Sequence, residues 1–238
     1  TILVLVLTLA ASLLWMARAL DHDAREASVE MMRAAAAGVL RQIETITLDY
    51  AKWDEAAERV AAGDETWIYR NVGSATAAGV QLVIVHGEAL PRELGWDDQA
   101  SEGARAGVLA PGDMAWLDAA LDGMPLGEAE AVTRFVRREG QVFAVATSRI
   151  EPFLDEAVGL PDAPAPRLVM GLLMDEGVIA ELSGRTFLAG LRLTTRLPVD
   201  GMALPLPGPY DAPAGFIAWD APAPGPALLR GMLPALLG

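Results

Sequence analysis

The chain of 238 residues contains no cysteine and only two histidines. His22 and His86 lie far apart in the sequence, so neither a thiolate cluster nor a pair of histidines at metal-ligand spacing is available. We therefore expect no metal site and no cofactor. Because there are no cysteines, disulfide counting gives no information about the cellular compartment.

Basic residues are also scarce. The sequence has 18 lysines and arginines against 32 aspartates and glutamates, which gives a formal net charge of −14. A surface of this charge repels the phosphates of DNA and RNA. The charge balance therefore argues against nucleic acid as a partner.

The short motifs of common enzymes are missing as well. The sequence has no G-x-S-x-G elbow, no H-E-x-x-H helix and no phosphate-binding loop. The adjacent carboxylates of Asp175 and Glu176 diverge from each other, and Asp175 suits the role of a helix cap. His86 lies in a predicted hairpin turn, where solvent exposure is the ordinary explanation. We expect no catalytic residues and no enzyme activity in this chain.

Hydrophobic residues make up 53% of the chain, which is enough to form a sizeable core. The most apolar stretches are residues 2–17, interrupted only by Thr8 and Ser12, and residues 227–238. A complete membrane helix needs about 20 apolar residues. We predict a truncated transmembrane helix at 1–20, an extracytoplasmic domain at 21–226 and the start of a second span at 227–238. A signal peptide is the alternative for the first stretch, and an ordinary amphipathic helix for the second.

Apolar side chains then recur in steps of three and four residues, which is a heptad pattern. This pattern predicts a long helix over residues 21–63 that ends at Gly63, with Asp64 capping the next turn. Its apolar stripe can pair with the same helix of a second chain, giving a homodimer, or pack on a sheet of its own domain. Both alternatives stay open. The stripe comprises Val29, Met32, Ala36, Val39, Ile43, Ile46, Tyr50, Trp53, Ala57 and Val60.

Residues 64–226 show short apolar runs separated by turn signals. Gly87 and the Glu139–Gly140 pair each indicate a β-hairpin. Hairpins mixed with helices favour an α+β fold with an antiparallel sheet. The predicted strands are 80–85, 131–137, 142–148, 168–174, 188–195 and 215–219; the predicted helices are 114–121, capped by Asp113, and 176–182, capped by Asp175; residues 199–213 are predicted as a loop.

One segment carries a resemblance to a known family. The hexapeptide DYAKWD at residues 49–54, followed by Trp67, Tyr69 and Asn71, resembles the opening motif of the fourth type of CHASE domain, a sensor module of the wider Cache group. The run from Trp219 to Gly225 (WDAPAPG) is similar to the way such modules approach their second membrane helix. The resemblance covers most of the chain.

The resemblance implies a PAS-like, Cache-like antiparallel sheet with a long N-terminal helix, flanked by two spans in the inner membrane and facing the periplasm. It further implies attached cytoplasmic GGDEF and EAL domains, which make or degrade cyclic di-GMP. The alternatives are the sensor of a histidine kinase or of a chemoreceptor. A membrane-tethered module that binds a protein and no small molecule is a third possibility.

The same hexapeptide contains the candidate ligand-binding residues. Asp49 and Trp53 stand four residues apart on the predicted helix, as do Tyr50 and Asp54, so each aromatic ring is paired with a carboxylate. Such pairs can hold a cationic group of an unidentified small-molecule ligand. The structural alternative is that the aspartates bond backbone amides while Trp53 fills the core. The candidate ligand-binding residues are Asp49, Trp53, Asp54, Tyr69, Asn71 and, for an anionic group, Arg149.

Overall fold

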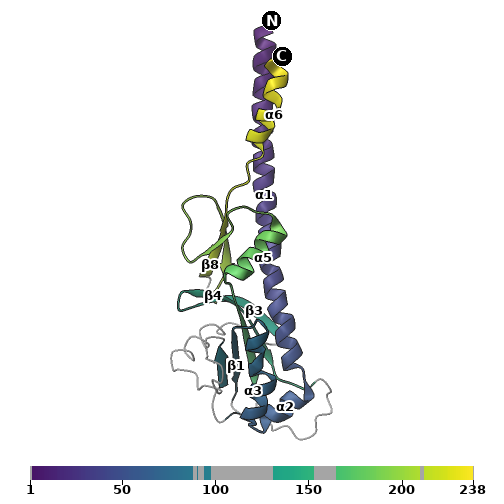
Figure 1. Cartoon of the computed structure of the whole chain (residues 1–238), viewed down its shortest axis with the longest axis vertical. Coiled ribbons are helices and arrows are strands. Elements are labelled where there is room, and N and C mark those ends of the chain that lie inside the picture. Colours follow the sequence, from purple (N-terminus) through teal and green to yellow (C-terminus); the bar gives the residue numbers. More distant parts are fainter. Residues whose placement is uncertain are drawn as a thin grey trace.

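The computed structural model describes residues 2–87, 90, 94–97, 131–152, 165–209 and 212–237. The helix predicted at 114–121 lies outside these residues. The described chain is an α+β structure in which one long helix, α1 (Ile2–Ala51), runs the length of the molecule beside two antiparallel sheets (Figure 1). The fold class expected from the hairpin pattern is therefore confirmed.

The single helix predicted over residues 21–63 is wrong in its second half. α1 ends at Ala51, Trp53 has extended backbone angles (φ −143°, ψ 119°), and a separate helix α2 (Asp54–Ala61) follows. The break coincides with a tertiary contact, because the Glu151 N–H donates to the Ala51 carbonyl over 3.2 Å and Glu151 forms an isolated bridge with Lys52. Pairing with residue 151 thus replaces the next turn of the helix.

The end of the helical segment agrees with the prediction. Gly63 follows α2 with φ 68°, a left-handed angle that glycine adopts without steric cost. Asp64 then caps α3 (Glu65–Asn71) by accepting a hydrogen bond of 3.1 Å from the Trp67 N–H. A short 3-10 helix, η1 (Gly73–Ala78), leads into the first sheet.

The larger sheet has five strands in the order β2-β1-β5-β4-β3, and every neighbouring pair is antiparallel. The hairpin predicted at Glu139–Gly140 is confirmed. For the one predicted at Gly87, β1 and β2 do pair antiparallel, but the return strand starts at Leu94 and most of the connection lies outside the described residues. In the confirmed hairpin, Glu139 (φ 51°) and Gly140 (φ 84°) form the two-residue turn with two positive φ angles that such a tight hairpin requires. The strands are β1 (Leu82–His86), β2 (Leu94–Asp97), β3 (Ala131–Arg138), β4 (Gln141–Arg149) and β5 (Arg167–Leu173).

The smaller sheet has three strands in the order β6-β8-β7. Its members are β6 (Arg192–Thr194), β7 (Met202–Pro207) and β8 (Pro213–Trp219), and it is connected to β5 by helix α5 (Glu176–Thr186), which Asp175 caps as expected. The loop predicted at 199–213 is wrong, because β7 occupies much of it. As an edge strand, β7 needs backbone N–H groups on one side only, so Pro205 and Pro207 are tolerated.

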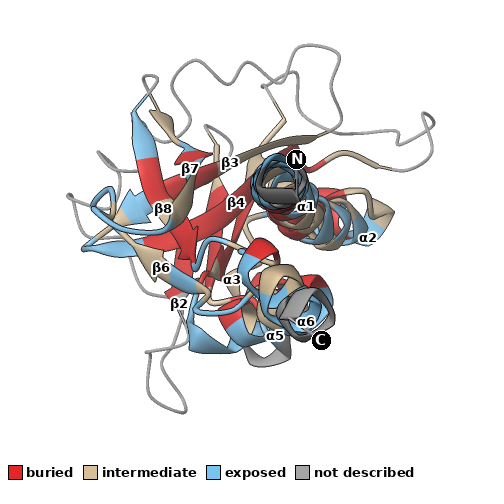
Figure 2. Ribbon diagram, turned by 90° about the horizontal axis from the view of Figure 1, so that it is seen from above, coloured by how far each residue is buried: buried red, intermediate tan, exposed pale blue. Residues whose placement is uncertain are grey.

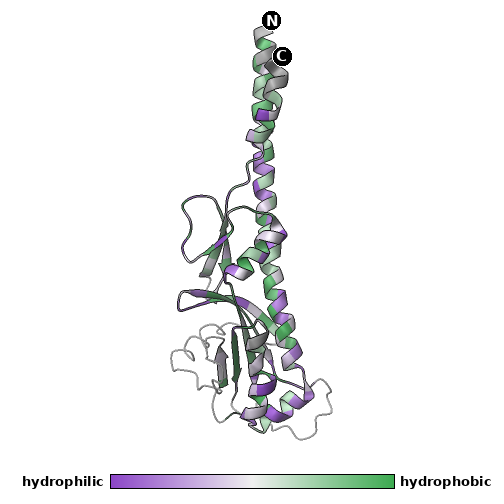
Figure 3. Cartoon of the chain, viewed as in Figure 1, coloured by the Kyte–Doolittle hydropathy of each residue, from purple (hydrophilic) through white to green (hydrophobic). Residues whose placement is uncertain are grey.

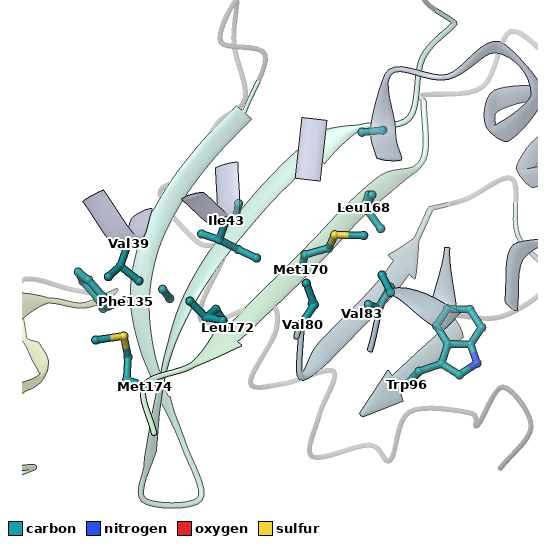
Figure 4. Packing of buried hydrophobic residues seen from close by; sticks show 14 of the residues in the cluster. Val39, Ile43, Val80, Val83, Trp96, Phe135, Leu168, Met170, Leu172 and Met174 are labelled. Carbon is teal, nitrogen blue, oxygen red and sulfur yellow. The ribbon is translucent and has the colours of Figure 1, made fainter. Parts of the chain in front are cut away.

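The core lies mainly between α1 and one face of the larger sheet. Val39 and Ile43 of α1 point toward the sheet, near Phe135 and Leu172 (Figure 4). Side chains alternate between the faces of each strand, so that Leu82, Ile84, Val136, Phe143, Val145 and Val169 form a second, smaller cluster on the other face. Seen along α1, the buried residues gather where the strands meet this helix (Figure 2).

The heptad stripe of α1 packs within its own domain. Met32 and Ile43 are fully buried, and Ala36 and Val39 are nearly so, all within the same core cluster. Of the two alternatives for the stripe, packing on its own sheet is therefore what the structure shows for these residues.

The last helix, α6 (Gly225–Leu237), packs along the N-terminal part of α1, so that both ends of the chain lie at the same end of the molecule (Figures 1 and 2). Apolar residues predominate where the two helices run together (Figure 3). Within the part of the chain that the structure describes, no helix combines the length and hydropathy needed to cross a bilayer. The spans at 1–20 and 227–238 stay predictions.

Candidate functional site

The predicted ligand-binding residues lie at the end of the molecule opposite to the chain termini, where α1 gives way to α2 and α3 (Figure 1). Two of the aromatic side chains there form a pair: the rings of Trp53 and Trp67 have centroids 5.0 Å apart and are tilted by 50°. The Trp67 indole N–H donates to Glu55 Oε1 over 3.1 Å. Trp53 itself is half-buried and packs against the core cluster.

The polar members of the predicted set are dispersed around this pair. The Asn71 side-chain amide donates to the Trp67 carbonyl over 2.9 Å, so it stabilises the end of α3. Tyr69 packs against Trp96, with ring centroids 6.0 Å apart. Asp49 is exposed on α1, and Asp54 is the half-buried first residue of α2. The structure therefore packs Trp53 against α3, whose last residue is Asn71, whereas the Asp49 side chain faces solvent.

Arg149 belongs to a neighbouring group of charges. Its Nη1 lies 3.8 Å from Glu151 Oε1, while the other oxygen of Glu151 lies 2.8 Å from Lys52 Nζ. The lysine side chain is 25% exposed and the glutamate 36%, so water screens their attraction only in part. Lys52, Trp53, Trp67 and Glu151 are called the distal cluster below. Lys52 and Glu151 join the end of α1 to the segment that follows β4, and the two indole rings join it to α3.

A cavity of about 790 Å³ lies elsewhere, between α5, the β3–β4 turn and residues 190–193. Val142, Met174 and Ile179 contribute buried apolar surface to it, and Gln141 and Arg192 lie among its exposed residues. Its volume falls within the range of small-molecule sites, which are typically apolar with a few polar groups at fixed places.

Most polar groups around this cavity already have partners. Asp175 Oδ1 accepts from the Val178 N–H over 2.9 Å, and the Ser183 hydroxyl donates to the Leu188 carbonyl over 3.2 Å. Arg192 donates to the Gly190 carbonyl over 2.9 Å. These bonds fix the cavity wall, so that a ligand would meet a formed surface and would pay little to organise it.

Sequence reasoning missed this cavity. Its walls come from three segments, around residues 140, 175 and 190, that share no motif. The only local signals were the glycines: Gly140 and Gly190 both have left-handed backbone angles, φ 84° and 66°. Among the residues that the structure describes, no group of three His, Cys, Asp or Glu side chains is placed to hold a metal ion.

A family model for the CHASE4 domain matches residues 39–194, which is well over half of the chain. The match includes the distal cluster, the larger sheet and the cavity residues up to β6. No curated protein matches the chain. CHASE4 domains are sensor domains and not catalytic ones. On the residues first noted at 49–54, on the α+β architecture and on this match, the chain belongs to the CHASE4 family of sensor domains.

Proposed function

We propose that this chain is the periplasmic signal-sensing part of a bacterial inner-membrane protein that regulates cytoplasmic cyclic di-GMP turnover. The observation that carries this proposal, besides the family, is the joint exit of α1 and α6 at one end of the molecule (Figure 1). A domain built in this way can stand on a membrane with its sheets turned away from it. Several large apolar side chains are exposed near that end, as lipid contact would require: Leu14, Trp15, Met16, Leu20 and Met232.

We further propose that the ligand binds in the cavity beside α5. The apolar floor and exposed polar rim suit a small molecule with an apolar body and one or two polar groups. The distal residues Asp49, Trp53, Asp54, Tyr69, Asn71 and Arg149 form a second candidate site, which the exposed Asp49 and the half-buried Trp53 favour. The larger sheet and long helix agree with a PAS-like, Cache-like sensor.

The two candidate sites can be separated by substitution. The whole chain, in detergent micelles, would be screened with a metabolite library for ligands that raise its melting temperature. Ala180 is exposed and lines the cavity, so Ala180→Trp fills the cavity without disturbing the core. Glu181→Trp places the same ring on the next, exposed position of α5, which does not line the cavity, and serves as the control.

Loss of stabilisation in Ala180→Trp, with retention in Glu181→Trp, supports the cavity. Loss in Asp49→Ala or Trp53→Ala alone moves the site to the distal residues. The output is tested on the full-length protein in nanodiscs, by measuring cyclic di-GMP synthesis and hydrolysis with and without the ligand found. If no ligand changes the output, the sensing proposal is contradicted. If the output is a kinase or a chemoreceptor signal, only the proposed link to cyclic di-GMP is wrong.

A homodimer along α1 remains part of the proposal, but it needs a different face from the heptad stripe. Met32 is fully buried against its own domain, whereas the neighbouring Met31 is 45% exposed. Because the chain has no natural cysteine, single substitutions are clean probes. Met31→Cys is expected to give disulfide-linked dimers in membranes and Met32→Cys is not. A monomer in both cases contradicts the dimer.

A further inference from the structure

A buried hydrogen bond of the β8 strand joins the three-stranded sheet to α1. Trp219, the last residue of β8, is fully buried, and its indole N–H donates to Ser28 Oγ over 3.1 Å. The Ser28 side chain is itself 3% exposed and donates to the Arg25 carbonyl over 2.7 Å. Since the donor and acceptor are buried, the bond fixes β8 on α1.

A second contact lies seven residues up the same face of α1. Asp21 Oδ1 accepts a hydrogen bond of 2.6 Å from the backbone N–H of Gly225, the first residue of α6. The first N–H groups of a helix have no partner within it, so this carboxylate of another helix caps α6. Glycine is required there: a Cβ atom at residue 225 would lie 2.5 Å from the carbonyl oxygen of the nearly buried Ala17.

The segment between these two contacts is short and stiff. Residues 220–224 read Asp-Ala-Pro-Ala-Pro, and each proline fixes its own φ angle. Because the linker is semi-rigid, a displacement of its first residue also displaces the start of α6.

The start of the linker is in turn attached to the cavity wall. The Asp220 N–H donates to the Ala189 carbonyl over 2.9 Å, and Asp220 Oδ1 lies 3.9 Å from Arg192 Nη1. A Cβ atom added to Gly190 would lie 2.5 Å from Asp220 Oδ2. Gly190 and Arg192 line the cavity, so one residue connects that wall to the linker.

We propose that the Trp219–Ser28 and Gly225–Asp21 contacts form a latch between α6 and α1, and that the cavity wall controls it through Asp220. A shift of residues 189–192 moves Asp220 and the linker, breaks the Gly225–Asp21 bond and lets α6 move relative to α1. The latch thus has two states, closed and open, which ligand occupancy can favour unequally. The role of the ligand in causing this shift rests on the proposed function. The coupling between the cavity wall and α6 needs no ligand.

Amide hydrogen exchange, followed by mass spectrometry on the whole chain in detergent micelles, tests the latch directly. Asp21→Ala removes the acceptor, and we expect the amides of Gly225 and of residues 227–229 to exchange about tenfold faster, in line with the loss of a charge-assisted hydrogen bond; Pro226 has no amide hydrogen. Asp21→Asn keeps an oxygen acceptor and should restore most of the protection. Glu26→Ala, at a side chain 70% exposed on α1, is the control and should change nothing.

Two glycine variants test the connection to the cavity. Gly140 and Gly190 both line the cavity and both have left-handed φ angles, so alanine strains the backbone at either position. Only at Gly190 does the new Cβ meet Asp220; at Gly140 no atom lies within 4 Å of it. Gly190→Ala is expected to speed exchange at residues 225–229 as Asp21→Ala does, and Gly140→Ala is not.

Unchanged exchange at 225–229 in Asp21→Ala overturns the latch, and the Asp21 pair decides this even where Gly190→Ala fails to fold. Equal effects of Gly190→Ala and Gly140→Ala overturn the control by the cavity wall. The proposed function fails separately, through absence of a ligand or of a signalling response. A measured coupling with no ligand response would leave the latch standing and reject the sensing proposal.

Discussion

The long helix α1 is held at two places, and they are built differently. At the distal cluster the helix end is joined to Glu151, just after β4, by an ion pair of 2.8 Å and a backbone hydrogen bond of 3.2 Å, and Trp53 packs on Trp67 of α3. At the latch, the polar contacts with the C-terminal segment are two separate hydrogen bonds, one of them made by the buried Trp219. An ion pair, a backbone hydrogen bond and a ring contact act together at the first place, whereas the two hydrogen bonds of the latch lie seven residues apart along α1.

The difference assigns separate roles to the two helices at the chain ends. α1 continues without interruption from the latch to Ala51, and its 50 residues correspond to a rod of about 75 Å. Its distal end is fixed to the sheet, so α1 serves as the reference against which α6 moves. Of the two latch contacts, Gly225–Asp21 belongs to α6, the element that leaves the domain, and Trp219–Ser28 belongs to β8.

The largest expected effect comes from removing the Trp219 side chain, which forms the buried contact of the latch with Ser28. Trp219 is the largest fully buried side chain among the described residues, so Trp219→Ala should lower the free energy of unfolding by about 3–5 kcal/mol. Trp219→Phe keeps most of the volume and loses the bond to Ser28, for a cost of about 1–2 kcal/mol. Urea unfolding followed by circular dichroism measures both. If the phenylalanine variant costs as much as alanine, the hydrogen bond and not the packing is the main anchor.

Next in size is a steric clash introduced at Gly73, where η1 packs against Trp96 of β2 and Tyr69 of α3. A Cβ atom at Gly73 would lie 2.8 Å from the Trp96 ring and 3.1 Å from Tyr69, so Gly73→Ala should cost about 1–3 kcal/mol. Gly184 lies in α5 with no atom within 4 Å of its added Cβ, and Gly184→Ala is expected to stabilise by up to about 1 kcal/mol. Thermal unfolding of the two variants gives the contrast. A neutral Gly73→Ala would show that Trp96 moves aside easily.

The ion pair of the distal cluster gives a smaller effect that depends on salt. Lys52→Met removes the partner of Glu151 at a partly exposed position, and we expect a loss of about 1 kcal/mol in low salt. Because salt screens the pair, the difference from the unsubstituted chain should shrink in about 1 M NaCl. Arg33→Met removes the more exposed Glu30–Arg33 pair and should cost almost nothing. If both variants lose the same free energy of unfolding, the partly buried Lys52–Glu151 pair is no more stabilising than the exposed Glu30–Arg33 pair.

Sequence patterns predicted the elements whose cause is local. The Glu139–Gly140 turn, the Asp64 and Asp175 caps and the Gly63 end all follow from the preferences of a few adjacent residues. The break at Trp53 was missed, since the apolar stripe continues through it and only the pairing with Glu151 interrupts the helix. Likewise, β7 reads as a proline-rich loop until its edge position in the sheet is known.

The sites were harder to predict than the elements, for the same reason. The latch joins residues 191 and 204 positions apart, and Ser28 and Asp21 look like ordinary polar residues on a helix. The cavity draws its wall from three separate segments. By contrast, the DYAKWD motif is contiguous, so the sequence alone displays it. The motif alone does not show the role of its residues. In the structure Trp53 packs on Trp67 and Asp49 faces solvent.

The smallest expected effect separates overall stability from the latch. Glu139 occupies a left-handed position (φ 51°) in the β3–β4 turn, where asparagine followed by glycine is strongly preferred. Glu139→Asn should therefore raise the free energy of unfolding by about 0.5 kcal/mol. The turn lines the cavity through Gly140, and among the described residues it makes no backbone hydrogen bond to Asp220 or to α6, so exchange at residues 225–229 should stay as it is. Slower exchange in this variant would mean that α6 opens only with the whole domain, which removes the contrast between a fixed distal end and a separately opening latch.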